Sequence, residues 1–295
     1  RDCAKRLNYK PNIMASNLRT CKNTTIGIVL PEVNHHFFAS VLDGIEQTAN
    51  EAGYNIIICQ TGENVEKEVQ SIQTLMGSRV AGILAGISKQ TCTFQHLQEV
   101  INADIPLVLY DRPCPSLPCD QVVSDDYLGA FKAVEYLIQT GCQRIMYFSS
   151  PMQLEVAHRR YQGWRDALQR YNMPIDDSMI VTCDSRAQAI IETPMVLKRD
   201  DKPDAIFCVN DDCASGVLYA AQILGLKIPE ELAICGFSNA PLCRNTFPML
   251  TTVEQHGVEI GKHAIIRLLK RLSGDERIAQ TEMIATDLIV RETTK

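Results

Sequence analysis

Polar side chains follow several apolar runs of this sequence, at the points where the runs end. Asn210 and Asp211 come directly after the run AIFCV and before an amphipathic stretch, and Asp125 follows the run VVS in the same way. One residue of such a pair can cap the following helix, which leaves the other free to hydrogen-bond a polar ligand. The sequence leaves open which residue has which role.

An aromatic ring and a guanidinium lie in similar places. Phe37 stands just beyond the run at 25–31 and outside the apolar stripe that follows, so its ring either stacks on a ligand or packs in a loop. Arg160 borders an apolar stripe just past the run at 144–149. A guanidinium there presents a fork of donors suited to paired hydroxyls or a carboxylate. We expect loss of Arg160 to remove ligand binding and to leave the fold intact.

No catalytic motif accompanies these side chains. The sequence has no GxSxG, no GxGxxG after an apolar run, no P-loop and no HExxH. His35 and His36 are adjacent rather than at ligand spacing, so we expect neither a metal site nor a cofactor there. The twelve cysteines form no CxxC pair, and we expect them to be reduced structural thiols. These observations favour a binding protein over an enzyme.

The elements that position these residues alternate regularly. Short apolar runs predict strands, and stretches with apolar residues three or four apart predict helices. Strands that are apolar throughout and joined by helices indicate parallel sheets covered on both faces, which is an α/β fold. We expect strands at 25–31, 55–60, 80–85, 106–110, 121–124, 144–149, 179–183, 204–209, 232–236, 250–254 and 282–291, and helices at 38–52, 65–77, 91–103, 127–140, 155–172, 186–199, 212–224 and 257–272.

The alternation restarts near residue 144, after a proline-rich segment at 111–120 that we expect to be a surface loop. Two units of similar build leave a cleft between them, and ligands of open α/β sheets bind beyond the carboxyl ends of the strands. The 295 residues are enough for two domains. We expect one lobe from 24–141 with 256–273, and a second lobe from 142–255 with 274–295.

The first 23 residues differ in charge from the rest. They carry six basic side chains against the single acid Asp2, whereas the whole chain has a formal net charge of −6. A basic arm on an acidic body indicates contact with nucleic acid. Pro11 and an apolar stripe that reaches Leu18 and Cys21 predict a short helix, which is marginal alone in water. We expect it to fold only against a partner, and we take the chain as a fragment of a longer protein.

Short motifs along essentially the whole chain resemble the LacI/GalR family of bacterial transcriptional repressors. The resemblance implies a two-lobed, periplasmic-binding-protein-like α/β fold, each lobe a parallel sheet flanked by helices. It also implies a homodimer and a helix-turn-helix headpiece that is mostly outside this sequence. The motifs are YKPN (9–12), LRT (18–20), IGIVLP (26–31), FFA (37–39), GIE (44–46), RVAGI (79–83), DRP (111–113), RYQGW (160–164), ND (210–211), GFSNAP (236–241) and LTTV (250–253).

The same resemblance implies roles for individual residues. Residues 11–18 are similar to the family's hinge helix, in which a leucine wedges into the minor groove and kinks operator DNA. The implied hinge positions are Pro11, Asn12, Ala15, Ser16, Leu18 and Arg19, with Ser16 where an arginine is common. The implied effector contacts are Phe37, Asp125, Arg160, Asn210, Asp211 and Ser238, with Ser238 where an aspartate is common.

The resulting hypothesis is a ligand-gated DNA-binding repressor. A small polar effector, a sugar or sugar derivative, would change the angle between the lobes and so the affinity for operator DNA. The alternative is a solute-binding protein of a sugar transporter, which should carry a signal peptide and for which twelve cysteines would be a liability. Because no run reaches membrane-spanning length and no signal-peptide core is present, we expect a cytoplasmic protein without a membrane segment.

Overall fold

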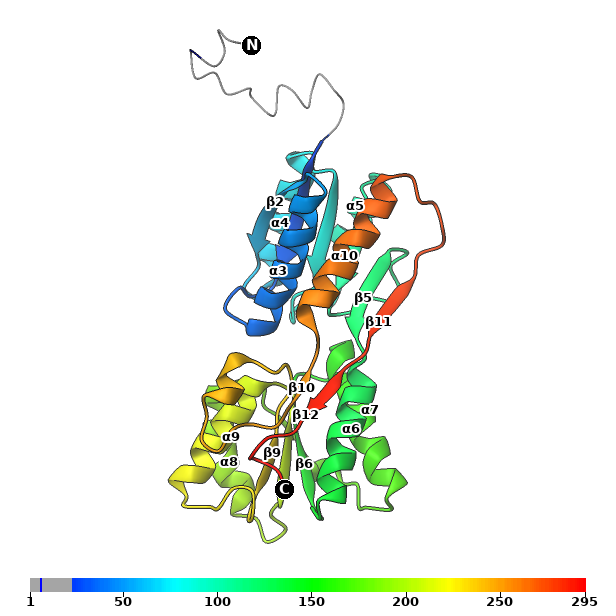
Figure 1. The fold of residues 1–295 in the computed structure, drawn as a ribbon. Helices are drawn as coiled ribbons and strands as arrows, with labels where there is room; N and C mark the ends of the chain where they lie inside the picture. The colour runs from blue at the N-terminus through cyan, green and yellow to red at the C-terminus, as the bar shows by residue number, and fades with distance from the viewer. Residues whose placement is uncertain (1–5, 7–22) are drawn as a thin grey trace.

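The computed structural model describes Arg6 and residues 23–295, and the latter form two stacked lobes (Figure 1). Each lobe is a parallel sheet flanked by helices, which confirms the predicted fold class. The predicted hinge residues at 11–19 lie outside the described residues. Within the described part, no helix has the length and apolar character needed to cross a membrane.

The N-terminal lobe contains a six-stranded sheet. Its strands are β1 (Thr25–Leu30), β2 (Asn55–Gln60), β3 (Gly82–Gly86), β4 (Leu107–Tyr110), β5 (Asp120–Ser124) and β11 (Thr281–Ile284), in the order β11-β5-β4-β3-β1-β2, and all neighbours are parallel. Its helices are α3 (His36–Glu51), α4 (Val65–Gly77), α5 (Gln95–Asn102) and α10 (Gly257–Leu272). The helices α3 and α10 cover one face of the sheet, and α4 and α5 cover the other.

The C-terminal lobe contains a four-stranded parallel sheet in the order β7-β6-β8-β9. Its elements are α6 (Asp126–Gln139), β6 (Ile145–Ser149), α7 (Glu155–Arg170), η1 (Asp177–Met179), β7 (Ile180–Thr182), α8 (Arg186–Leu197), β8 (Ala205–Cys208), α9 (Asp211–Ile223), β9 (Ala233–Cys235) and η2 (Pro241–Arg244). The helices α6 and α7 cover one face, and α8 and α9 cover the other. A two-stranded antiparallel pair, β10 (Thr252–Glu254) with β12 (Asp287–Ile289), adjoins this lobe.

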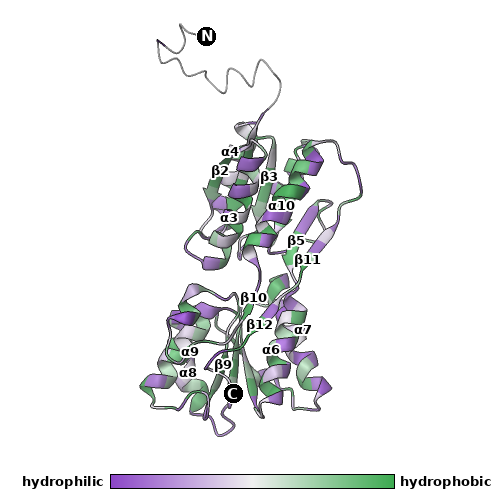
Figure 2. Cartoon of the chain, viewed as in Figure 1, coloured by the Kyte–Doolittle hydropathy of each residue, from purple (hydrophilic) through white to green (hydrophobic). Residues whose placement is uncertain are grey.

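Burial on both faces explains why most of the strands are apolar throughout. In β6, Tyr147 faces one core cluster and Phe148 faces the other, and both rings are fully buried. Figure 2 shows that hydrophobic residues are concentrated in the inner strands, whereas hydrophilic residues lie mainly on the helices that cover them. The edge strand β2 is an exception to the predicted two-sided burial, since Ile57 and Ile58 are exposed.

Glycines allow α3 and α10 to pack closely. A Cβ at Gly261 would lie 2.1 Å from the Val41 carbonyl oxygen, and a Cβ at Gly44 would lie 2.1 Å from that of Val258. Real side chains do not fit at such distances, so any larger residue would push the helices apart. This contact fixes α10 in the N-terminal lobe, although it follows the C-terminal lobe in sequence.

The chain crosses between the lobes near residues 124–126, 254–257 and 284–287, and two segments lie elsewhere than the expected boundaries place them. The helix α6, expected in the N-terminal lobe, packs against α7 in the C-terminal lobe. The final strand, expected as one element at 282–291, is divided. Its first part, β11, joins the N-terminal sheet, and its second part, β12, pairs with β10.

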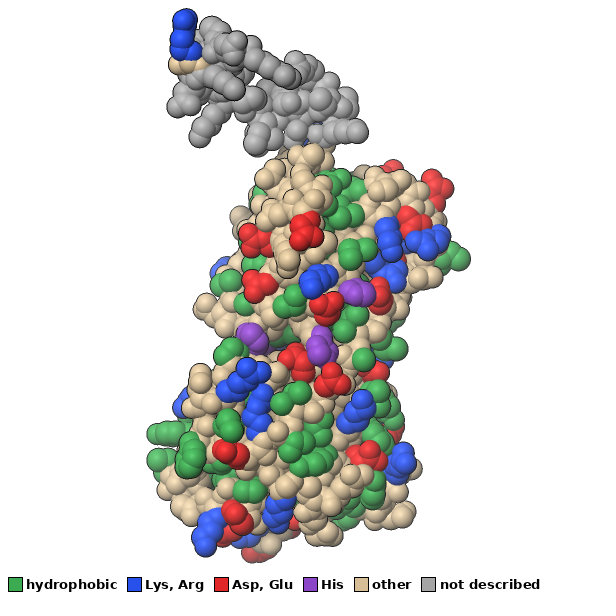
Figure 3. Space-filling view, viewed as in Figure 1, with side chains coloured by type: hydrophobic (Ala, Val, Ile, Leu, Met, Phe, Trp, Pro, Cys, Tyr) green, Lys and Arg blue, Asp and Glu red, His purple; other side chains and the backbone are tan. Residues whose placement is uncertain are grey.

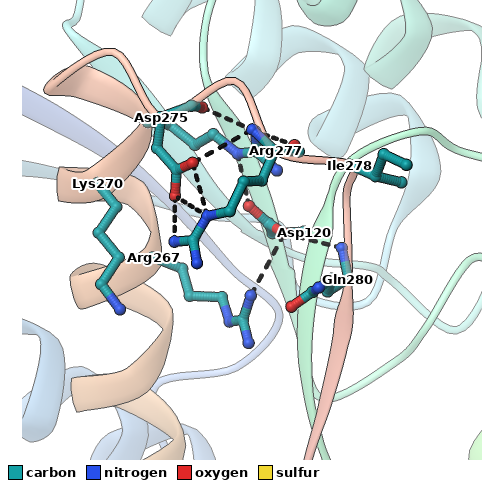
Figure 4. A pocket seen from close by; sticks show the side chains of 8 residues that line it. Asp120, Arg267, Lys270, Asp275, Arg277, Ile278 and Gln280 are labelled. Carbon is teal, nitrogen blue, oxygen red and sulfur yellow. Dashed lines mark hydrogen bonds and ion pairs between the residues drawn. The ribbon is translucent and has the colours of Figure 1, made fainter.

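Charged side chains fasten the segment before β11 to α10 and β5 (Figure 4). Asp120 accepts hydrogen bonds from Arg271 Nε at 2.7 Å and from the Gln280 backbone N–H at 2.9 Å. Arg277 folds back on Asp275, with Nε at 2.8 Å from Oδ1. These contacts give the cluster a structural role in holding β11 at the edge of the sheet.

The proline-rich segment at 111–120 differs from the expected surface loop. Asp111, Arg112 and Cys114 are buried. Gln121 holds the segment by accepting a hydrogen bond from the Cys114 N–H at 2.8 Å and donating one to its carbonyl at 2.9 Å. The start of this segment therefore forms part of the boundary between the lobes.

Candidate functional site

Loops at the carboxyl ends of strands from both sheets meet between the lobes and enclose a polar cavity of about 60 Å³, here named the inner cavity. Its position agrees with the expected ligand site of an open α/β sheet. On the face shown in Figure 3, histidine and acidic side chains gather where the two lobes meet. The side chains on which the chemistry of the inner cavity depends are Phe37, Glu63, Lys89, Asp111, Arg112 and Arg160.

Arg112 is held by a two-pronged ion pair with Glu63. Its Nη1 and Nη2 lie 2.7 and 2.8 Å from the two Glu63 oxygens, and Nη1 also donates to the Ile87 carbonyl at 2.6 Å. Burial opposes ionisation of Glu63, but the hydrogen bonds and charge of Arg112 outweigh it and lower the pKa of this carboxyl. The buried Arg112 Nε has no partner within the described part of the chain. Two of the five N–H groups of Arg112, that of Nε among them, therefore remain for a ligand.

Asp111 supplies a carboxylate beside that donor. It is buried, lines the inner cavity, and has Arg112 Nε as its neighbouring cation at 3.5 Å, beyond hydrogen-bond distance. Burial raises the pKa of Asp111 to about 6, although Arg112 partly offsets the effect. A buried carboxylate without a close donor costs stability, which indicates a position kept for binding.

The raised pKa of Asp111 predicts a pH-dependent stability. The folded state holds this proton to about pH 6, while the unfolded chain releases it near pH 4. Within that window the folded state binds more protons, so the free energy of unfolding falls as the pH rises. Urea unfolding between pH 4 and pH 7 should show this decrease, and the Asp111→Asn variant should show a smaller one. Parallel profiles would contradict the assignment.

Arg160 is already committed to a buried ion pair. Its Nε and Nη2 each lie 2.7 Å from Asp126 Oδ1, Nη1 donates to the Val209 carbonyl, and the guanidinium lies 3.8 Å from the Phe237 ring centroid. Burial raises the pKa of Asp126, and Arg160 offsets this in part. Two of the five N–H groups of Arg160 remain for a ligand. The expectation that Arg160 can be removed without harm to the fold is therefore revised.

Asn210 and Asp211 both serve the fold. Asn210 is the N-cap of α9, where its side-chain oxygen accepts from the Cys213 N–H at 2.8 Å, and it lines the inner cavity. Asp211 accepts from the Ala240 N–H at 2.7 Å and from Thr252 Oγ1 at 2.5 Å. Each carboxylate oxygen thus accepts one hydrogen bond from the protein, and these bonds position the loop that carries the next residues of the site.

Ser238 lies at the junction of the lobes. Its hydroxyl donates to Gln255 Oε1 at 2.8 Å, and Gln255 Nε2 donates to Ser124 Oγ at 3.2 Å. Both Ser238 and Gln255 line the inner cavity. This chain joins a loop of the C-terminal lobe to two of the crossing segments, so a ligand that contacts Ser238 also contacts the hinge between the lobes.

Phe37 and Asp125 are two further predicted site residues. Phe37 lies at the start of α3, past the end of β1, and lines the inner cavity; it is 3% exposed and packs edge-on against Phe38. Asp125 lies outside the cavity lining and is the N-cap of α6, where it accepts from the Leu128 N–H at 3.0 Å. The structure therefore shows the helix-cap role that the sequence left open for Asp125, and a ligand contact there stays a prediction.

A direct ion pair closes the cleft. Lys89 Nζ, from the loop after β3, lies 2.9 Å from Asp184 Oδ2, which follows β7 in the other lobe. The Asp184 carbonyl also accepts from Asn210 Nδ2 at 2.8 Å, so the pair is anchored beside the cavity. Both side chains are partly exposed, and such pairs contribute no more than about 1 kcal/mol. The pair is thus weak enough to open and close.

Proteins similar to this chain agree with this architecture. Residues 134–294 match the family model described as a periplasmic binding protein-like domain. The chain is 32% identical to the HTH-type transcriptional repressor PurR of Vibrio vulnificus, over 98% of this chain and 86% of that protein. It is 34% identical to catabolite control protein A of Priestia megaterium, over 92% and 82%. A periplasmic binding protein/LacI transcriptional regulator from Alkaliphilus metalliredigens, solved with D-xylulofuranose, is 28% identical and superimposes with a TM-score of 0.81 over 92% of this chain and 100% of that one.

The fold and its polar interlobe cavity define a two-lobed protein of the periplasmic-binding-protein-like class. The relative PurR is named a transcriptional repressor, and catabolite control protein A is named a control protein, which decides against the solute-binding alternative and against an enzyme. The chain belongs to the LacI/GalR family and is a ligand-responsive transcriptional regulator.

Proposed function

We propose that the effector of this regulator is a small polyhydroxylated molecule, a sugar or sugar derivative, bound in the inner cavity. The observation that carries the proposal is the adjacent pair of Asp111 and Arg112, an acceptor without a close donor beside a donor without a partner. A sugar hydroxyl both donates and accepts, so one hydroxyl or two neighbouring ones satisfy both groups. The xylulofuranose complex of the similar regulator supports the same class of ligand.

The remaining contacts follow from the cavity lining. Phe37 supports the apolar face of a sugar ring, and the free N–H groups of Arg160 and the hydroxyl of Ser238 bind its edge. Asn210 completes the polar wall. Groups from both lobes then hold one ligand, so its binding favours the closed arrangement that the Lys89–Asp184 pair also favours.

The change between lobes is proposed to reach DNA through residues 11–19. There Pro11, Leu18 and the rest of the hinge segment precede β1 directly, and operator DNA is the proposed partner. Coupling between effector and operator is expected to be about 1–3 kcal/mol. We place this function in the cytoplasm, where the operator lies.

A second copy of the chain is proposed to cover an apolar surface on α8 and α9. Exposed apolar side chains gather there, with Ile223 71% exposed, and a patch of this kind marks an interface. The other members are Ile191, Met195, Tyr219 and Leu224, with Phe247 adjoining through a hydrogen bond from Gln222 to its carbonyl.

The Ile223→Glu variant is expected to dissociate this dimer, because a charge would be buried at its interface. Sedimentation velocity should show at least a tenfold increase in the dimer dissociation constant. Ile278, 88% exposed on the N-terminal lobe, provides the matched control, and Ile278→Glu should leave the dimer intact. Equal behaviour of the two variants would contradict the proposed interface.

Calorimetric titration tests the effector class. Pentoses, hexoses, sugar acids and nucleosides are titrated into the protein, followed by the same titrations into Arg112→Ala. We expect at least one sugar to bind, and the variant to lose that binding at least a hundredfold. Binding confined to non-sugar compounds, or unchanged in the variant, would refute the proposal.

A further inference from the structure

A second cavity adjoins the inner cavity at the edge of the cleft. It has a volume of about 220 Å³ and is lined by the loop before α3 on one side and by the start of α9 and η2 on the other. We name it the outer cavity. His35 and Ser238 line both cavities, so the two cavities are neighbours that share part of their lining.

The inner cavity is small for a ligand site. Small-molecule sites usually enclose roughly 300–1,000 Å³. The inner cavity, at about 60 Å³, falls well short of this range. With the outer cavity of about 220 Å³, the space between the lobes comes close to its lower end. The two cavities together therefore offer a ligand more room than either one alone.

The outer cavity is lined by polar groups, among them His35. The Nδ1 atom of His35 is buried and has no hydrogen-bond partner in the described part of the chain. Burial lowers the pKa of His35, with Asp212 partly opposing the shift, so the neutral ring is favoured. A neutral imidazole offers one donor and one acceptor, as a hydroxyl does.

The carboxylate of Asp212, unlike that of Asp211, accepts no hydrogen bond from the described part of the chain. Asp211 spends both oxygens on Ala240 and Thr252, whereas no side-chain or backbone donor in residues 23–295 bonds the Asp212 carboxylate. Asp212 is exposed and lines the outer cavity. It is a free acceptor on the side of the cavity opposite the histidines.

The lining also restricts the chemistry of the occupant. Among the described residues, neither lysine nor arginine lines the outer cavity, which disfavours a phosphate or carboxylate group. Pro241 and Leu242 supply an apolar wall, and Asn34 and His36 add hydrogen-bonding groups opposite. An apolar face with a hydroxylated edge is the structure of a sugar ring.

We propose that the outer cavity is a second sugar subsite and that the effector is a carbohydrate of two rings, a disaccharide or a comparable glycoside. One ring lies in the inner cavity against Asp111 and Arg112, and the second lies between His36 and Asp212. The inference rests on the proposed sugar-binding function and specifies the size of its ligand.

The test compares monosaccharides with disaccharides on three proteins. D-Glucose, D-galactose and D-xylose are titrated calorimetrically beside cellobiose, maltose, lactose and xylobiose. Asn34→Trp fills the outer cavity from an exposed loop position, and Val33→Trp places the same bulk on an exposed neighbour that lines neither cavity. Asp212→Ala removes one acceptor without adding bulk. Melting curves check that the variants fold.

We expect one disaccharide to bind at least tenfold more tightly than its own monosaccharide. Asn34→Trp should weaken the disaccharide at least tenfold and change the monosaccharide less than twofold, with Val33→Trp like the parent and Asp212→Ala intermediate. If a monosaccharide binds as tightly as every disaccharide that contains it, or Asn34→Trp has no effect, the second subsite is refuted and the proposed function stands. If no sugar binds, both fall.

Discussion

The Arg160→Ala variant is expected to lose about 3–5 kcal/mol of unfolding free energy, the cost of leaving a buried charge without its partner. Arg160 is 6% exposed, and Asp126, its partner, is more deeply buried. Removal of the guanidinium also leaves the Val209 carbonyl without its donor. Equilibrium unfolding in urea measures the loss.

The adjacent Arg159 provides a matched control. It lies on the same helix with its own partner, Glu155 at 2.9 Å, but that pair is partly exposed to solvent. Arg159→Ala should therefore change the free energy of unfolding by no more than about 0.5 kcal/mol. The double variant Arg160→Met with Asp126→Leu should recover most of the loss, because it removes both charges together. Equal effects of Arg159→Ala and Arg160→Ala would show that the buried pair is unimportant.

The Asp111→Asn variant is expected to stabilise the fold and to abolish function. At neutral pH the ionised carboxylate is held in a buried site, and its pKa of about 6 against about 4 in the unfolded chain corresponds to a cost of up to about 3 kcal/mol. Asparagine carries no charge and tolerates the positive φ of 69° at this position. The amide keeps one acceptor but loses the charged oxygen that grips sugar hydroxyls.

Two measurements on this variant should therefore move in opposite directions. The urea midpoint at pH 7.5 should rise, while the affinity for the effector should fall at least a hundredfold, as expected for a charge-assisted hydrogen bond in a closed site. Val33→Asn, at an exposed position of the same lobe, should change neither quantity. A decrease in both stability and affinity would indicate that Asp111 is a structural residue.

The alternation of strands and helices could be predicted from the sequence because most strands are buried on both faces. The run Ile145–Phe148 in β6, for example, has no charged residue and is fully buried for this reason. The division of the last strand could not be predicted from the sequence. Its two parts, β11 and β12, follow each other closely in the chain, but the first pairs with β5 and the second pairs with β10. The lobe to which α6 belongs depends on its contact with α7. Which helix packs against which cannot be read from the spacing of apolar residues in a single sequence.

The role of a site residue could be predicted from the sequence where that role depends only on its position between a strand and a helix. Asn210 follows a strand and caps a helix, and both features can be read from the sequence. The role of Asp126 could not be predicted, because this first residue of α6 pairs with Arg160 on α7, which is distant in sequence.

Asp111 and Arg112 were missed for a related reason. They directly follow the strand Leu107–Tyr110, which is the same signal that identified Asn210. The prolines after them indicated a surface loop instead, and the fold of that loop depends on Gln121. A strand end is therefore a more reliable indicator of the ligand site here than the composition of the loop that follows.

The affinity of the regulator for its operator, measured with and without saturating sugar, tests the central claim most directly. The measurement uses full-length protein that includes the DNA-binding headpiece, and the operator is obtained by selection from random duplexes. We predict that the sugar changes operator affinity at least fivefold, and that Asp111→Asn binds operator without this response. Equal operator affinity in the presence and absence of a sugar that calorimetry shows to be bound would contradict the account.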